Sequence, residues 1–300
     1  MQRSLLSLAE RSSFLRAIQR LIHDLKQPRT FIRFSILIGR QWPIRTRYVK
    51  TGLSAGALAV WSVSCLSKDS EHQLVINRAE ELYELRDWKG LYDYLRSYRD
   101  SDCADILWRL ARAARDVAQI EGTPNEEKKT LIYEAFDCVK RATELDPNNF
   151  ACQKWSGIIL SDVGDYEGNK AKILNAYVIR DHFTKAIELN PTDATSMHLL
   201  GLWRFTFADM PWYQRKAAAA FFASPPSSTY EEALELFAKA EEMDPGFYCN
   251  NHLMLGKTHL RLGHKEKAGF WLKKTIEYRA YKPEDKEAQK EADKLLRELF

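Results

Sequence analysis

The chain has 300 residues, of which 29% are charged and 45% hydrophobic, a composition typical of a folded globular protein rather than a disordered or fibrous one. Its net charge of +4 is unevenly distributed. Residues 1–68 carry nine Arg and three Lys against Glu10 and Asp24, a net of +10, whereas residues 69–300 hold 33 basic and 39 acidic residues, a net of −6. The five cysteines are odd in number and never form a CxxC pair, which argues against a disulfide framework and a cysteine-based zinc site.

Residues 1–70 are predicted to form a basic N-terminal arm, partly disordered, that targets or anchors the protein. Leu15, Ile18 and Leu21 recur at helical spacing among arginines, a pattern that resembles a mitochondrial transit segment. A disordered basic tail or a helix lying on a membrane surface is the alternative. The uncharged run 52–66 is shorter than the roughly 20 residues that a membrane-spanning helix needs. It is either a single anchor or a hydrophobic helix beside a presequence.

From about residue 71 the apolar residues follow a helical period. One stripe runs from Leu82 to Leu95 and a second from Ile106 to Val117, with apolar residues three and four apart. The segment 122–125 interrupts this pattern, and Pro124 lies where a new helix can begin. Residues 71–300 are therefore predicted to form one helical domain.

Three copies of the phrase A-x-E-[L/M]-[D/N]-P, at 142–147, 186–191 and 240–245, organise this domain. In each copy a proline ends an amphipathic helix, as at the close of a tetratricopeptide repeat of about 34 residues. Gly157, Gly201 and Gly256 follow these prolines by ten or eleven residues, where the first helix of a repeat needs a small residue. We predict an all-α, tetratricopeptide-like solenoid of helical hairpins with lengthened helices and inserts, preceded by the basic arm.

The spacing of the repeats is irregular. Pro147, Pro191 and Pro245 are 44 and 54 residues apart, which leaves insertions of roughly 10 and 20 residues beyond the usual repeat. We expect the first insertion to lengthen a second helix after a tight turn at residues 164–166. The second insertion is rich in aromatic residues, which either cap the solenoid internally or line an apolar groove. The groove residues would be Trp203, Phe207, Trp212, Tyr213, Phe221 and Phe222.

The inner face of the solenoid is the other candidate binding surface. Superimposing the repeat on each first helix directs mainly basic side chains inward, a set that would suit an acidic peptide or a phosphate-bearing head group. Alternatively, these groups are paired with neighbouring acids such as Asp116 and Asp162. Without a phosphate-binding loop, a metalloprotease helix or a nucleophile elbow, we expect no catalytic, cofactor-binding or metal-ligating residues, and no nucleic-acid partner. The predicted inner-face residues are Arg109, Lys154, His198, Phe205, Lys257 and Arg261.

Four segments resemble the regulator of microtubule dynamics protein family. They are LWRLARAARD at 107–116, SDVGDYEG at 161–168, ADMPWYQR at 208–215 and PPSSTY at 225–230, within a similarity that covers about residues 75–282. The resemblance implies a non-enzymatic tetratricopeptide-like protein that binds microtubules in the cytoplasm, at the spindle and its poles, and is also found at mitochondria.

Two other hypotheses remain open. The chain is alternatively a mitochondrial membrane-associated protein that contacts lipid through its N-terminal segment or its aromatic insert, which would enclose a lipid or an apolar peptide. A third class, an adaptor for acidic peptides, requires that the inner basic residues are unpaired.

Overall fold

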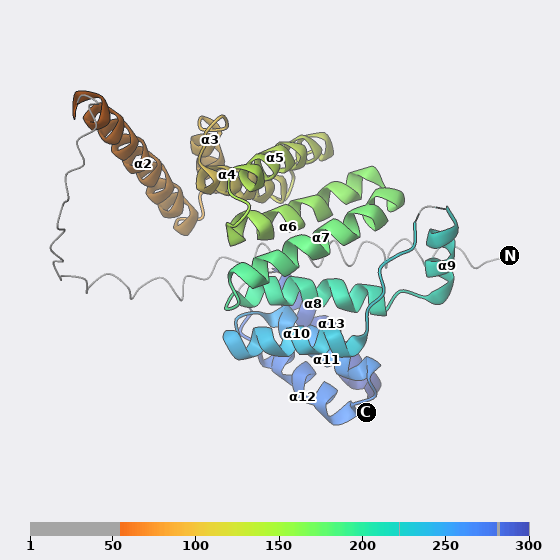
Figure 1. Ribbon diagram of the computed structural model, residues 1–300. Coiled ribbons are helices and arrows are strands. Elements are labelled where there is room, and N and C mark those ends of the chain that lie inside the picture. The colour runs from red at the N-terminus through yellow and green to blue at the C-terminus, as the bar shows by residue number, and fades with distance from the viewer. Residues whose placement is uncertain (1–54, 222, 281–282, 300) are drawn as a thin grey trace, which may run out of the picture.

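The computed structural model describes residues 55–221, 223–280 and 283–299, and within these ranges the regular elements are all α-helices (Figure 1). The predictions for residues 1–54 lie outside this part of the chain. The helices are α2 (Ala55–Glu84), α3 (Trp88–Arg96), α4 (Ala104–Ala118), α5 (Asn125–Leu145), α6 (Phe150–Glu167), α7 (Asn169–Leu189), α8 (Ala194–Ala208), α9 (Trp212–Phe221), α10 (Tyr230–Met243), α11 (Cys249–Arg261), α12 (Lys265–Glu277) and α13 (Pro283–Leu299).

Most of the helices pack in sequential pairs. The pairs α4/α5, α6/α7, α8/α10 and α11/α12 stack one beside the next, with α2 and α3 at one end and α13 against the last pair (Figure 1). Buried side chains from α2 to α11 form one continuous apolar core through the stack. The predicted all-α solenoid of helical hairpins is confirmed.

The repeated phrase produces the same helix end three times. Asp146, Asn190 and Asp244 precede the three prolines, and their backbones have nearly the same conformation. Their φ/ψ angles are −139°/86°, −137°/85° and −141°/86°, respectively. A following proline disfavours the helical conformation of the residue before it, so α5, α7 and α10 all end here. The backbone N–H of each residue donates to the carbonyl of the alanine four residues earlier, and these alanines are fully buried.

The predicted glycines lie where paired helices approach closely. A Cβ built on Gly157 of α6 would lie only 2.6 Å from a ring carbon of Phe183 on α7. Equivalent contacts occur at the next two pairs, where a Cβ on Gly201 would lie 2.8 Å from Phe237 and one on Gly256 would lie 2.8 Å from Leu272. These distances are shorter than van der Waals contact, so glycine permits the close pairing of the helices.

Two local predictions are wrong. The expected turn at residues 164–166 is helical, because α6 continues to Glu167 and the chain reverses at Gly168, whose φ of 86° favours glycine. Both α6, with 18 residues, and α7, with 21, are therefore long, so the first insertion is shared between them. The stripe from Leu82 to Leu95 is also broken, because Arg86 takes a left-handed φ of 59° and the Asp87 side chain caps α3.

The second insertion adds α9 between α8 and α10 in the sequence, and α9 protrudes from the side of the stack (Figure 1).

Near the start of the described residues, α2 continues across the predicted domain boundary at residue 70 as one helix, and Val75, Ala79 and Leu82 join the core. Within the described ranges, no helix combines the length and the apolar character needed to cross a membrane.

Candidate functional site

The predicted inner-face residue of α4, Arg109, is enclosed by acidic and aromatic neighbours. Its Nε lies 2.6 Å from Glu80 Oε1 on α2, and its Nη1 lies 3.0 Å from Asp105 Oδ1. The guanidinium also lies over the Trp108 ring, 4.1 Å from the centroid. Arg109 therefore joins α4 to α2, and its charge is already balanced by two carboxylates.

Lys154 of α6, in the next repeat, is also paired with a carboxylate. Its Nζ lies 3.1 Å from both carboxylate oxygens of Asp193, and its side chain is only 9% exposed. Asp193 in turn accepts the Ser196 N–H and caps α8. Burial alone would raise the pKa of Asp193, but the Lys154 charge and the Ser196 hydrogen bonds hold it below its usual value. The pair thus links α6 to the start of α8.

His198 of α8 is a core residue. It is buried between repeats against Phe237 and Tyr248, and its Nδ1 lies 2.8 Å from Asn251 Oδ1 on α11. Burial lowers the pKa of His198 to about 4, so the imidazole is neutral at pH 7. His198 therefore offers no charge and no exposed surface to a partner.

The last two predicted basic residues are paired as well. Lys257 Nζ lies 2.7 Å from Glu291 Oε1, and Arg261 Nε lies 2.6 Å from Asp209 Oδ1. All four cationic side chains of the predicted inner face thus have carboxylate partners, although not the Asp116 and Asp162 suggested by the sequence. The hypothesis that the chain is an adaptor for acidic peptides required unpaired inner cations, so these ion pairs argue against it.

Asp162 instead forms a buried ion pair with Arg115 that sequence reasoning missed. Arg115 Nε lies 2.5 Å from Asp162 Oδ2, and their side chains are 0% and 1% exposed. Burial raises the pKa of Asp162, and the adjacent guanidinium opposes that shift. The pair joins α4 to α6 across two repeats. Its only signal in the sequence is one charged residue at a helical core position on each side.

The aromatic residues of the second insertion divide into two groups. Trp203, Phe205 and Phe207 of α8 are buried, and the Trp203 indole N–H donates to the Ala176 carbonyl at 2.9 Å. These rings fill the interior rather than line an open groove. Trp212 and Tyr213 of α9 are 71% and 56% exposed. The remaining two groove candidates, the side chain of Phe221 and all of Phe222, lie outside the described residues.

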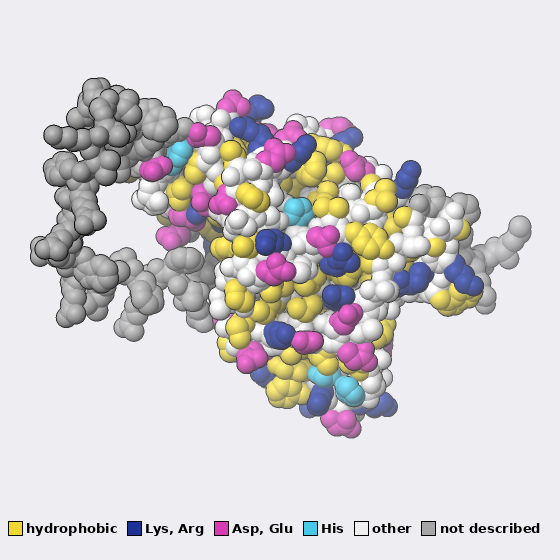
Figure 2. Space-filling view, in the orientation of Figure 1, with side chains coloured by type: hydrophobic (Ala, Val, Ile, Leu, Met, Phe, Trp, Pro, Cys, Tyr) yellow, Lys and Arg dark blue, Asp and Glu magenta, His cyan; other side chains and the backbone are white. Residues whose placement is uncertain are grey.

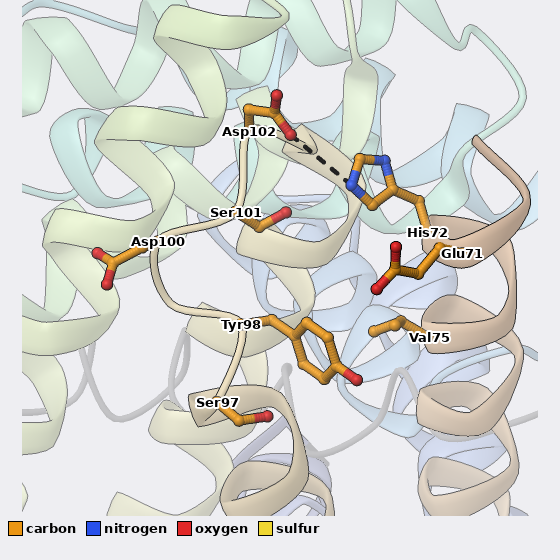
Figure 3. A pocket seen from close by; sticks show the side chains of 8 residues that line it. All are labelled: Glu71, His72, Val75, Ser97, Tyr98, Asp100, Ser101 and Asp102. Atoms are coloured by element: carbon orange, nitrogen blue, oxygen red, sulfur yellow. Dashed lines mark ion pairs between the residues drawn. The ribbon is translucent and has the colours of Figure 1, made fainter. Parts of the chain in front are cut away.

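A cavity of about 420 Å³ lies between α2 and the connection from α3 to α4 (Figure 3). His72 Nε2 lies 3.7 Å from Asp102 Oδ1 across it. Because Glu71 and Asp100 add further carboxylates, the cavity suits a basic group and would repel an acidic ligand. Its remaining lining residues are Val75, Ser97, Tyr98 and Ser101.

The described residues contain no group of three or more His, Cys, Asp or Glu side chains placed to hold a metal ion. Burial raises the pKa of both Cys138 and Cys152 to about 12, so these thiols stay protonated at neutral pH and are poor nucleophiles. The features that stand out among the described residues are the paired charges and the exposed aromatic side chains of α9.

Comparison with known proteins identifies the family. Residues 75–300 match the family described as regulator of microtubule dynamics protein 1-3. The regulator of microtubule dynamics protein 1 of Mus musculus is 49% identical over 269 residues, covering 88% of each chain. The Homo sapiens protein of that name is 61% identical over 189 residues, covering 63% of this chain and 60% of its own.

A structural comparison agrees on the fold. A thermophilic TPR protein of Thermus thermophilus is 13% identical, with a TM-score of 0.52 over 73% of this chain and 97% of its own. This likeness concerns the tetratricopeptide architecture alone. The match over residues 75–300 shows more: the chain belongs to the regulator of microtubule dynamics protein 1-3 family.

Proposed function

We propose that the chain is a non-enzymatic helical-repeat scaffold that binds microtubules and regulates their dynamics in the cytoplasm, including at the spindle. The observation that carries this proposal is the family match over the whole helical body, residues 75–300. A stack of helical hairpins suits the role, because such solenoids present extended surfaces to large partners.

The basic N-terminal arm and the acidic helical body would contribute differently to microtubule binding. Microtubules are strongly acidic, and the body of net −6 has its inner-face cations already paired with carboxylates. Long-range attraction therefore falls to residues 1–68, with a net of +10. Such attraction weakens as salt screens it, over a Debye length of about 8 Å at physiological ionic strength.

Co-sedimentation of the full chain with stabilised microtubules tests the proposal. We expect saturable binding at low salt, and weaker binding both at raised salt and after removal of residues 1–68. The same preparations should change growth or shortening rates of dynamic microtubules. A full chain that stays in the supernatant at low salt, alongside a pelleting control protein, would refute the proposed function.

A further inference from the structure

The outward face of α9 is apolar where a surface helix is normally polar. An α-helix has 3.6 residues per turn, which places Trp212, Tyr213 and Lys216 on one side of α9. These side chains and three alanines on the same side are exposed. Arg215 and Ala218 lie on the opposite side, toward the body. Figure 2 shows hydrophobic and basic side chains together on this protrusion. The helix therefore turns its two large aromatic rings to solvent and its arginine inward.

The base of α9 is held firmly by polar contacts. Arg215 donates to the carbonyls of Phe207 at 2.5 Å and Pro226 at 2.7 Å, and so ties both ends of the insert together. The Tyr177 hydroxyl donates to the Ser224 carbonyl at 2.9 Å. Asp209, which lies just before α9, is held by Tyr230 as well as by Arg261. The rings of α9 are thus presented on a fixed support, which lowers the entropy cost of binding.

The charge on the insert differs from that of the body. Residues 210–230 contain Arg215 and Lys216 and no acidic residue, whereas residues 69–300 as a whole have a net of −6. Lys216 Nζ lies 5.2 Å from the Trp212 ring centroid. Its charge therefore accompanies the apolar face without a carboxylate from the insert to neutralise it. Such a surface suits a partner that is acidic and offers an apolar recess.

We infer that the Trp212–Tyr213 face of α9 is the contact through which the folded body binds the tubulin lattice, an inference that rests on the proposed function. Trp and Tyr are enriched among the residues that dominate protein–protein binding energy. If the basic arm binds the same microtubule as α9, each contact raises the effective concentration of the other.

The test compares full-length Trp212→Ala/Tyr213→Ala with Phe270→Ala by microtubule co-sedimentation at low and raised salt. Phe270 is a matched control: it is 53% exposed on α12, and Lys274 Nζ lies 5.2 Å from its ring centroid, as Lys216 does from Trp212. Alanine preserves helix propensity and the replaced rings are exposed, so both variants should fold. We expect the double variant to bind at least about tenfold more weakly, with the loss persisting at raised salt, and the control to change by less than about twofold.

The outcomes separate this inference from the proposed function. If the unmodified chain does not pellet with microtubules, both fail. If it pellets and the double variant pellets equally well, only the assignment to α9 is overturned. Flotation with phosphatidylcholine–phosphatidylserine vesicles tests whether the α9 face binds a lipid surface instead. Sedimentation velocity tests whether it binds a second copy of the chain. The assignment also fails if the double substitution abolishes vesicle binding or self-association while microtubule binding is unchanged.

Discussion

The close approach at Gly157 makes a quantitative prediction for Gly157→Ala. The added Cβ would lie 2.6 Å and 2.9 Å from two ring carbons of Phe183, a side chain that is fully buried in the core. Overpacking of this kind costs about 1–3 kcal/mol. Replacing a helical glycine by alanine returns about 1 kcal/mol. We therefore expect a net loss of up to about 2 kcal/mol in the free energy of unfolding.

Gly164, in the same helix, is the matched control. A Cβ there would lie 3.2 Å from Lys172 Cγ, on a flexible side chain that can shift by a few tenths of an ångström. Gly164→Ala should therefore stabilise the protein by up to about 1 kcal/mol. Urea denaturation followed by circular dichroism gives both values, provided that the m-value is unchanged. A Gly157→Ala protein as stable as Gly164→Ala would refute the packing argument.

A double-mutant cycle locates the cause of the loss. Phe183→Leu shortens the side chain that the new Cβ would strike, so Gly157→Ala should cost less in the Phe183→Leu background than in the native one. We expect a coupling free energy of about 1 kcal/mol between the two sites, since residues in direct contact are not additive. Simple additivity would show that the alanine acts elsewhere in the helix.

Arg115→Met leaves the Asp162 carboxylate buried and unpaired and should cost about 3–5 kcal/mol, whereas Arg115→Met/Asp162→Leu should recover most of this in thermal denaturation. Equal losses in both variants would show that the charge is not the cause. The pKa of His198 is about 4 in the folded protein and 6.5 in the unfolded chain, so the unfolded chain binds a proton first as the pH falls. The contribution of neutral His198 to the free energy of unfolding is therefore full above pH 6.5 and is lost as the pH drops toward 4. Between pH 7 and pH 5 this amounts to about 2 kcal/mol. His198→Gln should remove that part of the pH dependence in urea titrations, and an unchanged slope would contradict it.

The sequence was sufficient for features that depend on local chemistry. A proline that follows a helix, or a glycine at a fixed distance from it, constrains the backbone wherever it occurs, so the ends of α5, α7 and α10 and the close approaches at Gly157, Gly201 and Gly256 were predictable. The break at Arg86 was not, because arginine carries no residue signal for the left-handed conformation with which α2 ends here.

The ion pairs of the inner face could have been predicted from the repeats. Arg109 and Glu80 are 29 residues apart, Lys154 and Asp193 are 39 apart, and Lys257 and Glu291 are 34 apart, each close to one repeat. Stacking places adjacent repeats side by side, so a cation on one first helix meets an acid from the repeat before or after it. The sequence reasoning placed the cations correctly on the first helices but compared them only with acids close in the helix.

The same stacking explains why α9 differs from the inner face. Arg109, Lys154 and Lys257 each pair with a carboxylate about one repeat away in the chain, and Arg261 pairs with Asp209 at the end of α8. The predicted inner face therefore keeps little net charge to attract a partner. Among the described residues, neither Arg215 nor Lys216 of the insert is paired with a carboxylate, and Arg215 donates to two backbone carbonyls. The insert at residues 210–230 contains no acid of its own, and it exposes the two aromatic rings that the core does not use. The feature that breaks the repeat period is therefore where we expect a partner to bind, and Trp212→Ala/Tyr213→Ala is the substitution that decides it.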